Sequence, residues 1–145
     1  MDARNRIYEI VVSIACLFIG GAIYLVFRTK SLLMFSWFDS LGLSKLIDSA
    51  RRCFSEVNLP YFVKYCLPNA LWIISYILIV DALIPINNHR LFWTMVLPGI
   101  AIVCELLQIC NLIPGTFDCG DLLCFSIPAI TYFVIYKIKY HENIS

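Results

Sequence analysis

Four long apolar runs constrain this chain more than any other feature of its sequence. The first, at 7–27, reads IYEIVVSIACLFIGGAIYLVF and carries one charged residue, Glu9, near its edge. Further runs follow at 67–84, 92–110 and 120–136. A helix of about 20 predominantly apolar residues crosses the hydrocarbon core of a bilayer. We therefore predict an all-α integral membrane protein, built as a four-helix bundle.

The composition agrees with a chain that is dissolved in lipid rather than in water. Hydrophobic residues make up 61% of the 145 residues and charged residues 14%. Soluble domains usually hold about 45–50% apolar and about 25% charged residues. In this interpretation residues 1–145 form a single membrane domain. The formal net charge of +1 gives no support to a nucleic acid as partner.

The segment between the first and second runs has a different pattern. At 39–54 the apolar residues recur at steps of three and four, which places them on one face of a helix. The charged residues lie largely off that face. We predict an amphipathic helix at 39–54 that lies in the membrane interface. The pattern leaves open the alternative of a helix packed on the spans.

Polar residues gather where the third run ends and the fourth begins, in CELLQICNLIPGTFDCGDLL at 104–123. Glu105 and Gln108 are three residues apart and share a helix face. Asp118 and Asp121 have the same spacing at the start of the fourth run. The Pro-Gly pair between the runs signals a tight turn. We therefore expect the two helices to be antiparallel neighbours and the four side chains to converge at one membrane edge.

We expect cationic partners for these acids from the first loop. Two spans separate the first loop from the third, so both loops lie on the same side of the membrane. Arg51 and Arg52 are the candidates. Basic residues favour the cytoplasmic side, but here they divide almost equally between the two sides. The first span and the polar tail favour both termini inside, which is the orientation that we predict.

The acids have a functional and a structural interpretation. An ionisable residue within a span costs roughly 2.5–3.5 kcal/mol and usually marks a functional site. Alternatively, Asp118 or Thr116 caps the fourth helix, Asp121 suits its dipole, and Glu105 pairs with an arginine of the first loop. Three carboxylates at one membrane face repel one another unless a cation binds there. Asp81, at the far end of the second span near His89 and Arg90, is interpreted as a pairing or interfacial residue.

The seven cysteines give little support to a metal centre. No CxxC occurs, and the chain has only two histidines, whereas zinc sites are built from paired cysteines and histidines. The cysteines are interpreted as small apolar packing residues. We predict no metal site and no cofactor from this pattern.

Two of these motifs resemble those of a known family. ELLQ, which contains Glu105 and Gln108, and DCGD, which contains Asp118 and Asp121, are similar to motifs of the VanZ-like family of small bacterial membrane proteins. The resemblance implies four spans and a bacterial cytoplasmic membrane. The family often has an arginine between the motifs and an asparagine after the second aspartate, and this chain has neither. An arginine that completes the site must then come from elsewhere, with Arg51 and Arg52 as candidates. The family's link to glycopeptide resistance need not extend to this chain.

Three functional hypotheses follow from the sequence. The first is a membrane protein whose acidic residues bind a cationic or amphiphilic small molecule, or a lipid headgroup, at the bilayer surface. The second is a membrane-surface enzyme that uses the carboxylates for metal or acid–base chemistry. The sequence contains no recognisable nucleophile–base pair, which argues against this hypothesis. The third is a purely structural subunit. A homo-oligomer is compatible with each, and a transport path would require one.

Overall fold

The computed structural model describes residues 3–29, 33–85 and 89–142, and every regular element among them is a helix. Four of these helices are long and apolar enough to cross a membrane. The all-helical architecture and the four candidate spans that the sequence predicts are therefore confirmed. The spans are α1 (Ala3–Phe27), α4 (Leu67–Leu83), α5 (Arg90–Ile109) and α6 (Cys119–Glu142).

The second and fourth spans are longer than predicted. A π-helical segment, η1 (Phe62–Cys66), leads directly into α4 and lengthens the second span to Phe62–Leu83. The fourth helix continues to Glu142, whereas the polar tail led us to end it at 136. A helix satisfies its own backbone hydrogen bonds, so it does not have to stop where the apolar side chains end.

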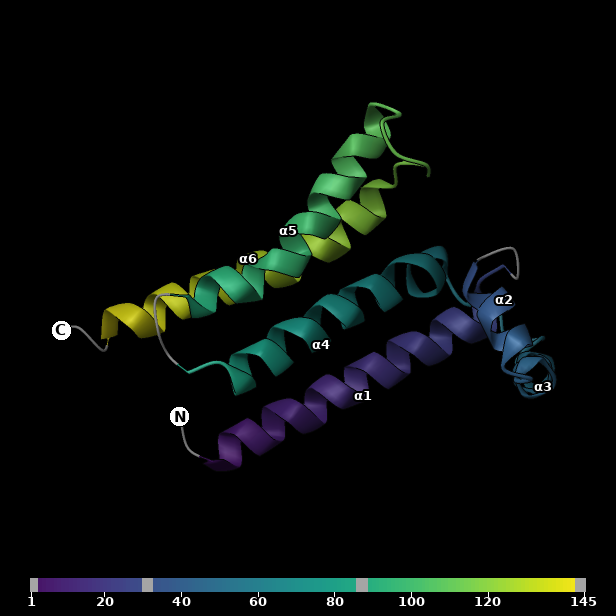
Figure 1. Cartoon of the computed structure of the whole chain (residues 1–145), viewed down its shortest axis with the longest axis horizontal. Helices are drawn as coiled ribbons and strands as arrows, with labels where there is room; N and C mark the ends of the chain where they lie inside the picture. Colours follow the sequence, from purple (N-terminus) through teal and green to yellow (C-terminus); the bar gives the residue numbers. More distant parts are fainter. Residues whose placement is uncertain (1–2, 30–32, 86–88, 143–145) are drawn as a thin grey trace.

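The four spans form an open arrangement (Figure 1). Helix α1 packs along α4, α4 packs on α5 and α6, and the last two pack on each other. Within the described residues α1 contacts neither α5 nor α6. The start of α1 and the end of α6 lie at the same end of the molecule in Figure 1. We call this the terminal end, and the opposite end, where α1 and α5 finish, the loop end.

Small residues hold α1 close to α4. A Cβ atom on Gly20 would lie 2.9 Å from Nε1 of Trp72 and 3.2 Å from the carbonyl oxygen of Pro68, so only glycine fits there. The hydroxyl of buried Ser13 donates to the carbonyl oxygen of Ser75 at 2.8 Å. In a membrane, such close backbone approach and interhelical hydrogen bonds are what associate two helices.

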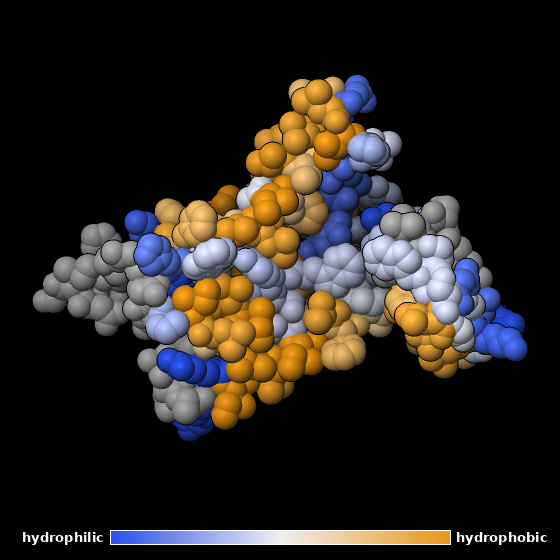
Figure 2. Space-filling view, in the orientation of Figure 1, coloured by the Kyte–Doolittle hydropathy of each residue, from blue (hydrophilic) through white to orange (hydrophobic). Residues whose placement is uncertain are grey.

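Prolines bend the last two spans. Pro98 lies inside α5 and Pro128 inside α6, and an interior proline removes a helical hydrogen bond and kinks the helix. Figure 1 shows both helices bending, so that the loop-end half of α5 rises away from α4, whereas the start of α6 stays in contact with η1. Figure 2 shows hydrophilic side chains gathered in the recess that this bend leaves open.

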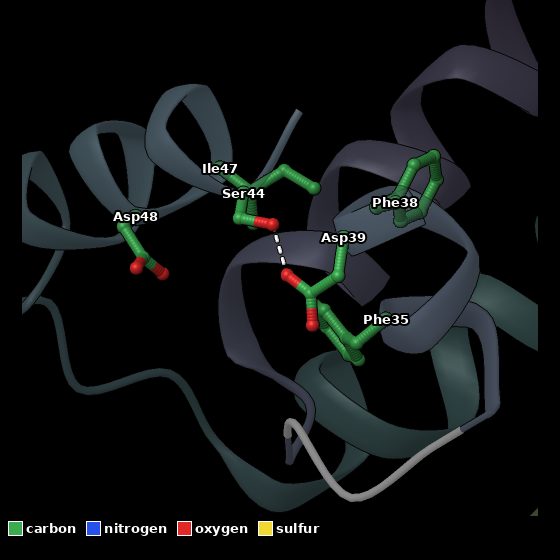
Figure 3. Close-up of a pocket in the computed structure, with 6 residues that line it drawn as sticks. All are labelled: Phe35, Phe38, Asp39, Ser44, Ile47 and Asp48. Atoms are coloured by element: carbon green, nitrogen blue, oxygen red, sulfur yellow. Dashed lines mark hydrogen bonds between the residues drawn. The ribbon is translucent and has the colours of Figure 1, made fainter. Parts of the chain in front are cut away.

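The first loop contains two helices, where the sequence led us to expect one at 39–54. They are α2 (Leu33–Ser40) and α3 (Ser44–Cys53). The predicted boundary is wrong because Gly42 has φ +72, a left-handed conformation that ends a helix. The Ser44 hydroxyl donates to the Asp39 carboxylate across this break, beside a pocket of about 110 Å³ (Figure 3). Helix α3 contacts α1 and buries no residue; its place at a membrane interface stays a prediction.

A polar network joins three spans near the terminal end. The Arg90 guanidinium forms an ion pair with Asp81, and its Nη2 donates to the Asp81 carbonyl oxygen at 2.5 Å. The hydroxyl of Tyr132 also donates to the Asp81 carboxylate. Asp81 lies in α4, Arg90 in α5 and Tyr132 in α6. The interpretation of Asp81 as a pairing residue is therefore confirmed.

Candidate functional site

The acids of the third and fourth spans converge at the loop end, as the sequence predicts. Glu105 is buried on the last turns of α5, with 7% of its surface exposed. Its Oε2 lies 3.4 Å from the backbone nitrogen of Asp118, which donates to it. Asp121 lies in the first turn of α6. The bends in α5 and α6 therefore carry three carboxylates to one place.

Asp118 is held by two hydrogen bonds. Its Oδ1 accepts from the backbone N–H of Gly120 at 2.7 Å, which caps α6 as the structural interpretation expects. Its Oδ2 accepts from the Tyr61 hydroxyl at 2.6 Å. The Tyr61 bond, followed by the Gly120 N–H, lowers the pKa of Asp118 below its usual range. The same bond stabilises the neutral phenol and raises the pKa of Tyr61 to about 12.

Asp121 and Gln108 have different surroundings. The Asn69 amide nitrogen donates to Oδ1 of Asp121 at 2.7 Å, which joins α4 to α6. Gln108 instead packs against the turn after α5, where a Cβ on Gly115 would lie 2.7 Å from its Nε2. Gly115 has φ +138, and the tight turn therefore needs glycine for both its conformation and its space. Gln108 belongs to α5, and its side chain packs against the loop. It therefore lies away from the hydrogen bonds that hold the aspartates.

The cation at this site is Arg28, which the sequence interpretation did not select. Its charge is a lesser cause of the lowered pKa of Asp118, behind the hydrogen bonds from Tyr61 and Gly120. The guanidinium carbon lies 5.2 Å from the ring centroid of Tyr24 and 5.1 Å from that of Tyr65, distances typical of cation–π contacts. Arg28 follows α1 directly, so the first span delivers it to the acids.

The two arginines of α3 are directed elsewhere. Nη1 of Arg51 donates to the carbonyl oxygen of Leu25 at 2.7 Å, and its guanidinium lies over the ring of Phe35. Nη2 of Arg52 donates to the hydroxyl of Ser49 at 3.2 Å on the exposed side of α3. The structure therefore does not bring Arg51 or Arg52 to the acids, because α3 packs against the end of α1.

Cys66 also belongs to this site, although the sequence interpretation treated it as a packing residue. The Cys66 Sγ atom and a carboxylate oxygen from each of Asp118 and Asp121 lie within 4.8 Å of one another. The thiol is buried, with 1% of the residue exposed. A signal was present nearby, because Tyr61, Tyr65 and Asn69 recur at steps of four and so mark a polar stripe on the second span.

These side chains form what we call the polar cluster, and its charge decides what it can hold. Its members are Arg28, Tyr61, Cys66, Asn69, Glu105, Asp118 and Asp121. Three carboxylates and one guanidinium give the polar cluster a formal charge of −2. A site that is partly shielded from water strengthens the attraction of this charge for a cation.

Comparison of the chain with protein-family models, curated proteins and solved structures gave no match. The resemblance to the VanZ-like family accordingly rests on the two short motifs. The structure places Glu105, Asp118 and Asp121 from these motifs in the polar cluster and turns Gln108 to the neighbouring loop.

Proposed function

We propose that this chain is a VanZ-like integral membrane protein of the bacterial cytoplasmic membrane. In this proposal the polar cluster binds the cationic group of an amphiphile or lipid. The observation that carries the proposal is the convergence of three carboxylates, with a single arginine, at one end of four candidate spans. An amine headgroup offsets the excess negative charge, and its apolar chains remain among the lipid chains beside the spans.

A second feature of the loop end supports an amphiphilic ligand. A hollow of about 470 Å³ is lined by Arg51 and Lys64, by the apolar side chains of Val26 and Phe27, and by one acid, Glu56. It adjoins the polar cluster along the chain, since Phe27 precedes Arg28 and Lys64 lies two residues before Cys66. Basic side chains beside apolar ones at a membrane edge suit a lipid phosphate. A zwitterionic headgroup would find both of its charges matched at this end.

The experiment compares lipids that differ only in headgroup. Short-chain phosphatidylethanolamine and phosphatidylglycerol are added to the detergent-solubilised protein, and the melting temperature is measured. We expect the ethanolamine lipid to raise the melting temperature by several degrees more than the glycerol lipid. Glu105→Gln and Asp121→Asn should remove this difference. Asp39→Asn, an exposed acid of α2 outside both the polar cluster and the hollow, is the matched control and should keep it.

The same measurement tests the structural alternative, which the capping of α6 by Asp118 favours. If the carboxylates serve only as caps and struts, Glu105→Gln and Asp121→Asn will melt well below the parent without any lipid. Equal stabilisation by the two lipids, or an ethanolamine effect that persists in Glu105→Gln, would show that the acids do not bind the headgroup.

A further inference from the structure

The polar cluster contains a set of three metal-ligating atoms drawn from two spans. The thiol of Cys66 comes from η1 before α4, and the carboxylates of Asp118 and Asp121 come from the start of α6. These atoms lie within 4.8 Å of one another. Donors around one tetrahedral ion with bonds of about 2.0–2.3 Å are roughly 3.5 Å apart. The set therefore needs to contract by about one ångström to hold an ion.

Each carboxylate of this set is oriented by a hydrogen bond from outside it. Tyr61 donates to Asp118 at 2.6 Å, and Asn69 donates to Asp121 at 2.7 Å. Both donors come from the polar stripe of the second span, the same segment that supplies Cys66. A carboxylate oxygen has two lone-pair directions, so each bond leaves room for a ligand. Outer partners of this kind orient the ligands in metal sites.

The backbone is also shaped to admit the thiol. A Cβ atom on Gly120 would lie 2.6 Å from Sγ of Cys66 and 3.1 Å from Oδ1 of Asp118. Only the missing side chain at this position lets the sulfur lie beside the carboxylate. Cys66 is 1% exposed, so the sulfur reaches the carboxylates from the interior. This buried thiol is an observation independent of the acids, and it points to a ligand that accepts sulfur.

We propose that Cys66, Asp118 and Asp121 bind a divalent transition-metal ion of the Zn²⁺ class. Mg²⁺ and Ca²⁺ prefer oxygen donors alone, whereas a thiolate with carboxylates suits a borderline ion such as Zn²⁺ or Co²⁺. A thiolate at Cys66 takes the formal charge of the cluster from −2 to −3, and the ion brings it to −1. The inference rests on the proposed function, because both require the carboxylates to attract positive charge.

The test uses Co²⁺, whose bond to a thiolate gives an absorption band in the near ultraviolet. Co²⁺ is titrated into the full-length protein in detergent at neutral pH. We expect the band to saturate at one ion per chain and Zn²⁺ to remove it by displacement. Cys66→Ser should abolish the band, and Asp121→Asn should weaken Co²⁺ binding by tenfold or more. Cys110→Ser removes an exposed thiol outside the polar cluster and should leave the band intact.

Three results would overturn the inference. One is a folded parent that gives no band, and another is a band that survives in Cys66→Ser. The third is a melting temperature that Mg²⁺ raises as much as Co²⁺ does. Should Cys66→Ser fail to fold, Asp121→Asn still decides, because it retains the thiol. A parent that responds to phosphatidylethanolamine and gives no band upholds the proposed function alone, whereas a band without a lipid response upholds the metal site alone.

Discussion

The two carboxylate oxygens of Asp118 make hydrogen bonds with different roles. One oxygen caps the backbone of α6, and the other accepts the phenol of Tyr61 from the start of the second span. The first bond is local and would form in any helix of this sequence. The second is a contact between distant parts of the chain and fixes where α6 begins relative to η1. A substitution that keeps one of these two hydrogen bonds and removes the other therefore distinguishes the contribution of helix capping from that of site assembly.

Asp118→Ala should destabilise the protein by about 1 kcal/mol or more, because loss of a helix cap costs about that much. Asp118→Asn keeps an oxygen that can cap the helix and should cost less. The free energy of unfolding of both variants is measured by denaturant titration in detergent. An alanine variant as stable as the asparagine variant would show that the cap contributes nothing.

The helix pair α1–α4 is the element on which the position of Arg28 depends. Gly20→Leu should destabilise this pair by about 1–3 kcal/mol, because overpacking a tight contact forces neighbours to shift. Gly21→Leu is the matched control, since a Cβ on Gly21 meets nothing within 4 Å. The two variants are compared by denaturant titration. Similar losses in both would mean that Gly20 does not set the approach of the helices.

The polar network at the terminal end should tolerate the loss of both partners better than the loss of one. Asp81→Asn removes the carboxylate that forms the ion pair with the buried guanidinium of Arg90, which is 5% exposed. Loss of one partner of a buried ion pair costs about 3–5 kcal/mol. The double variant Asp81→Asn with Arg90→Gln should regain part of that loss in the same titration. A double variant that is less stable than Asp81→Asn alone would contradict this account.

Local sequence patterns predicted the spans well and the polar cluster in part. The apolar runs and the i, i+3 spacing of the acids are local features, so the four helices and the convergence of Glu105, Asp118 and Asp121 could be predicted. Arg28 and Cys66 could not, because their place depends on how the first span packs against the second and the second against the fourth. No single segment of the sequence records that packing.

Two departures within the first loop and the fourth span have simpler physical causes. The amphipathic spacing continued through Gly42 in the sequence, but the positive φ of this residue divides the segment into α2 and α3. The polar tail was taken as the end of the fourth span, but the helix continues because its backbone bonds are internal. Side-chain polarity predicts where lipid ends better than where a helix ends.

At the scale of the whole molecule, the two loops of the loop end should lie on one side of the membrane. Cys53 after the first span and Cys110 after the third are both exposed. Variants in which Cys53 or Cys110 is the only cysteine left are treated in intact cells with a maleimide that does not cross membranes, since Cys119 is exposed as well. We expect both to react if the termini are cytoplasmic. Reaction of one without the other would contradict a four-span topology.

The open arrangement of the spans also dictates an order of assembly. Helix α1 contacts α4 but, within the described part of the chain, neither α5 nor α6. Its partner is synthesised only after the whole first loop, so α1 must enter the bilayer as a lone helix and wait there. The apolar run of α1 contains a single acidic residue, Glu9, so the helix can remain in the bilayer before α4 is inserted. The site at Arg28 is therefore completed late, when α4 and then α6 reach a helix already in place.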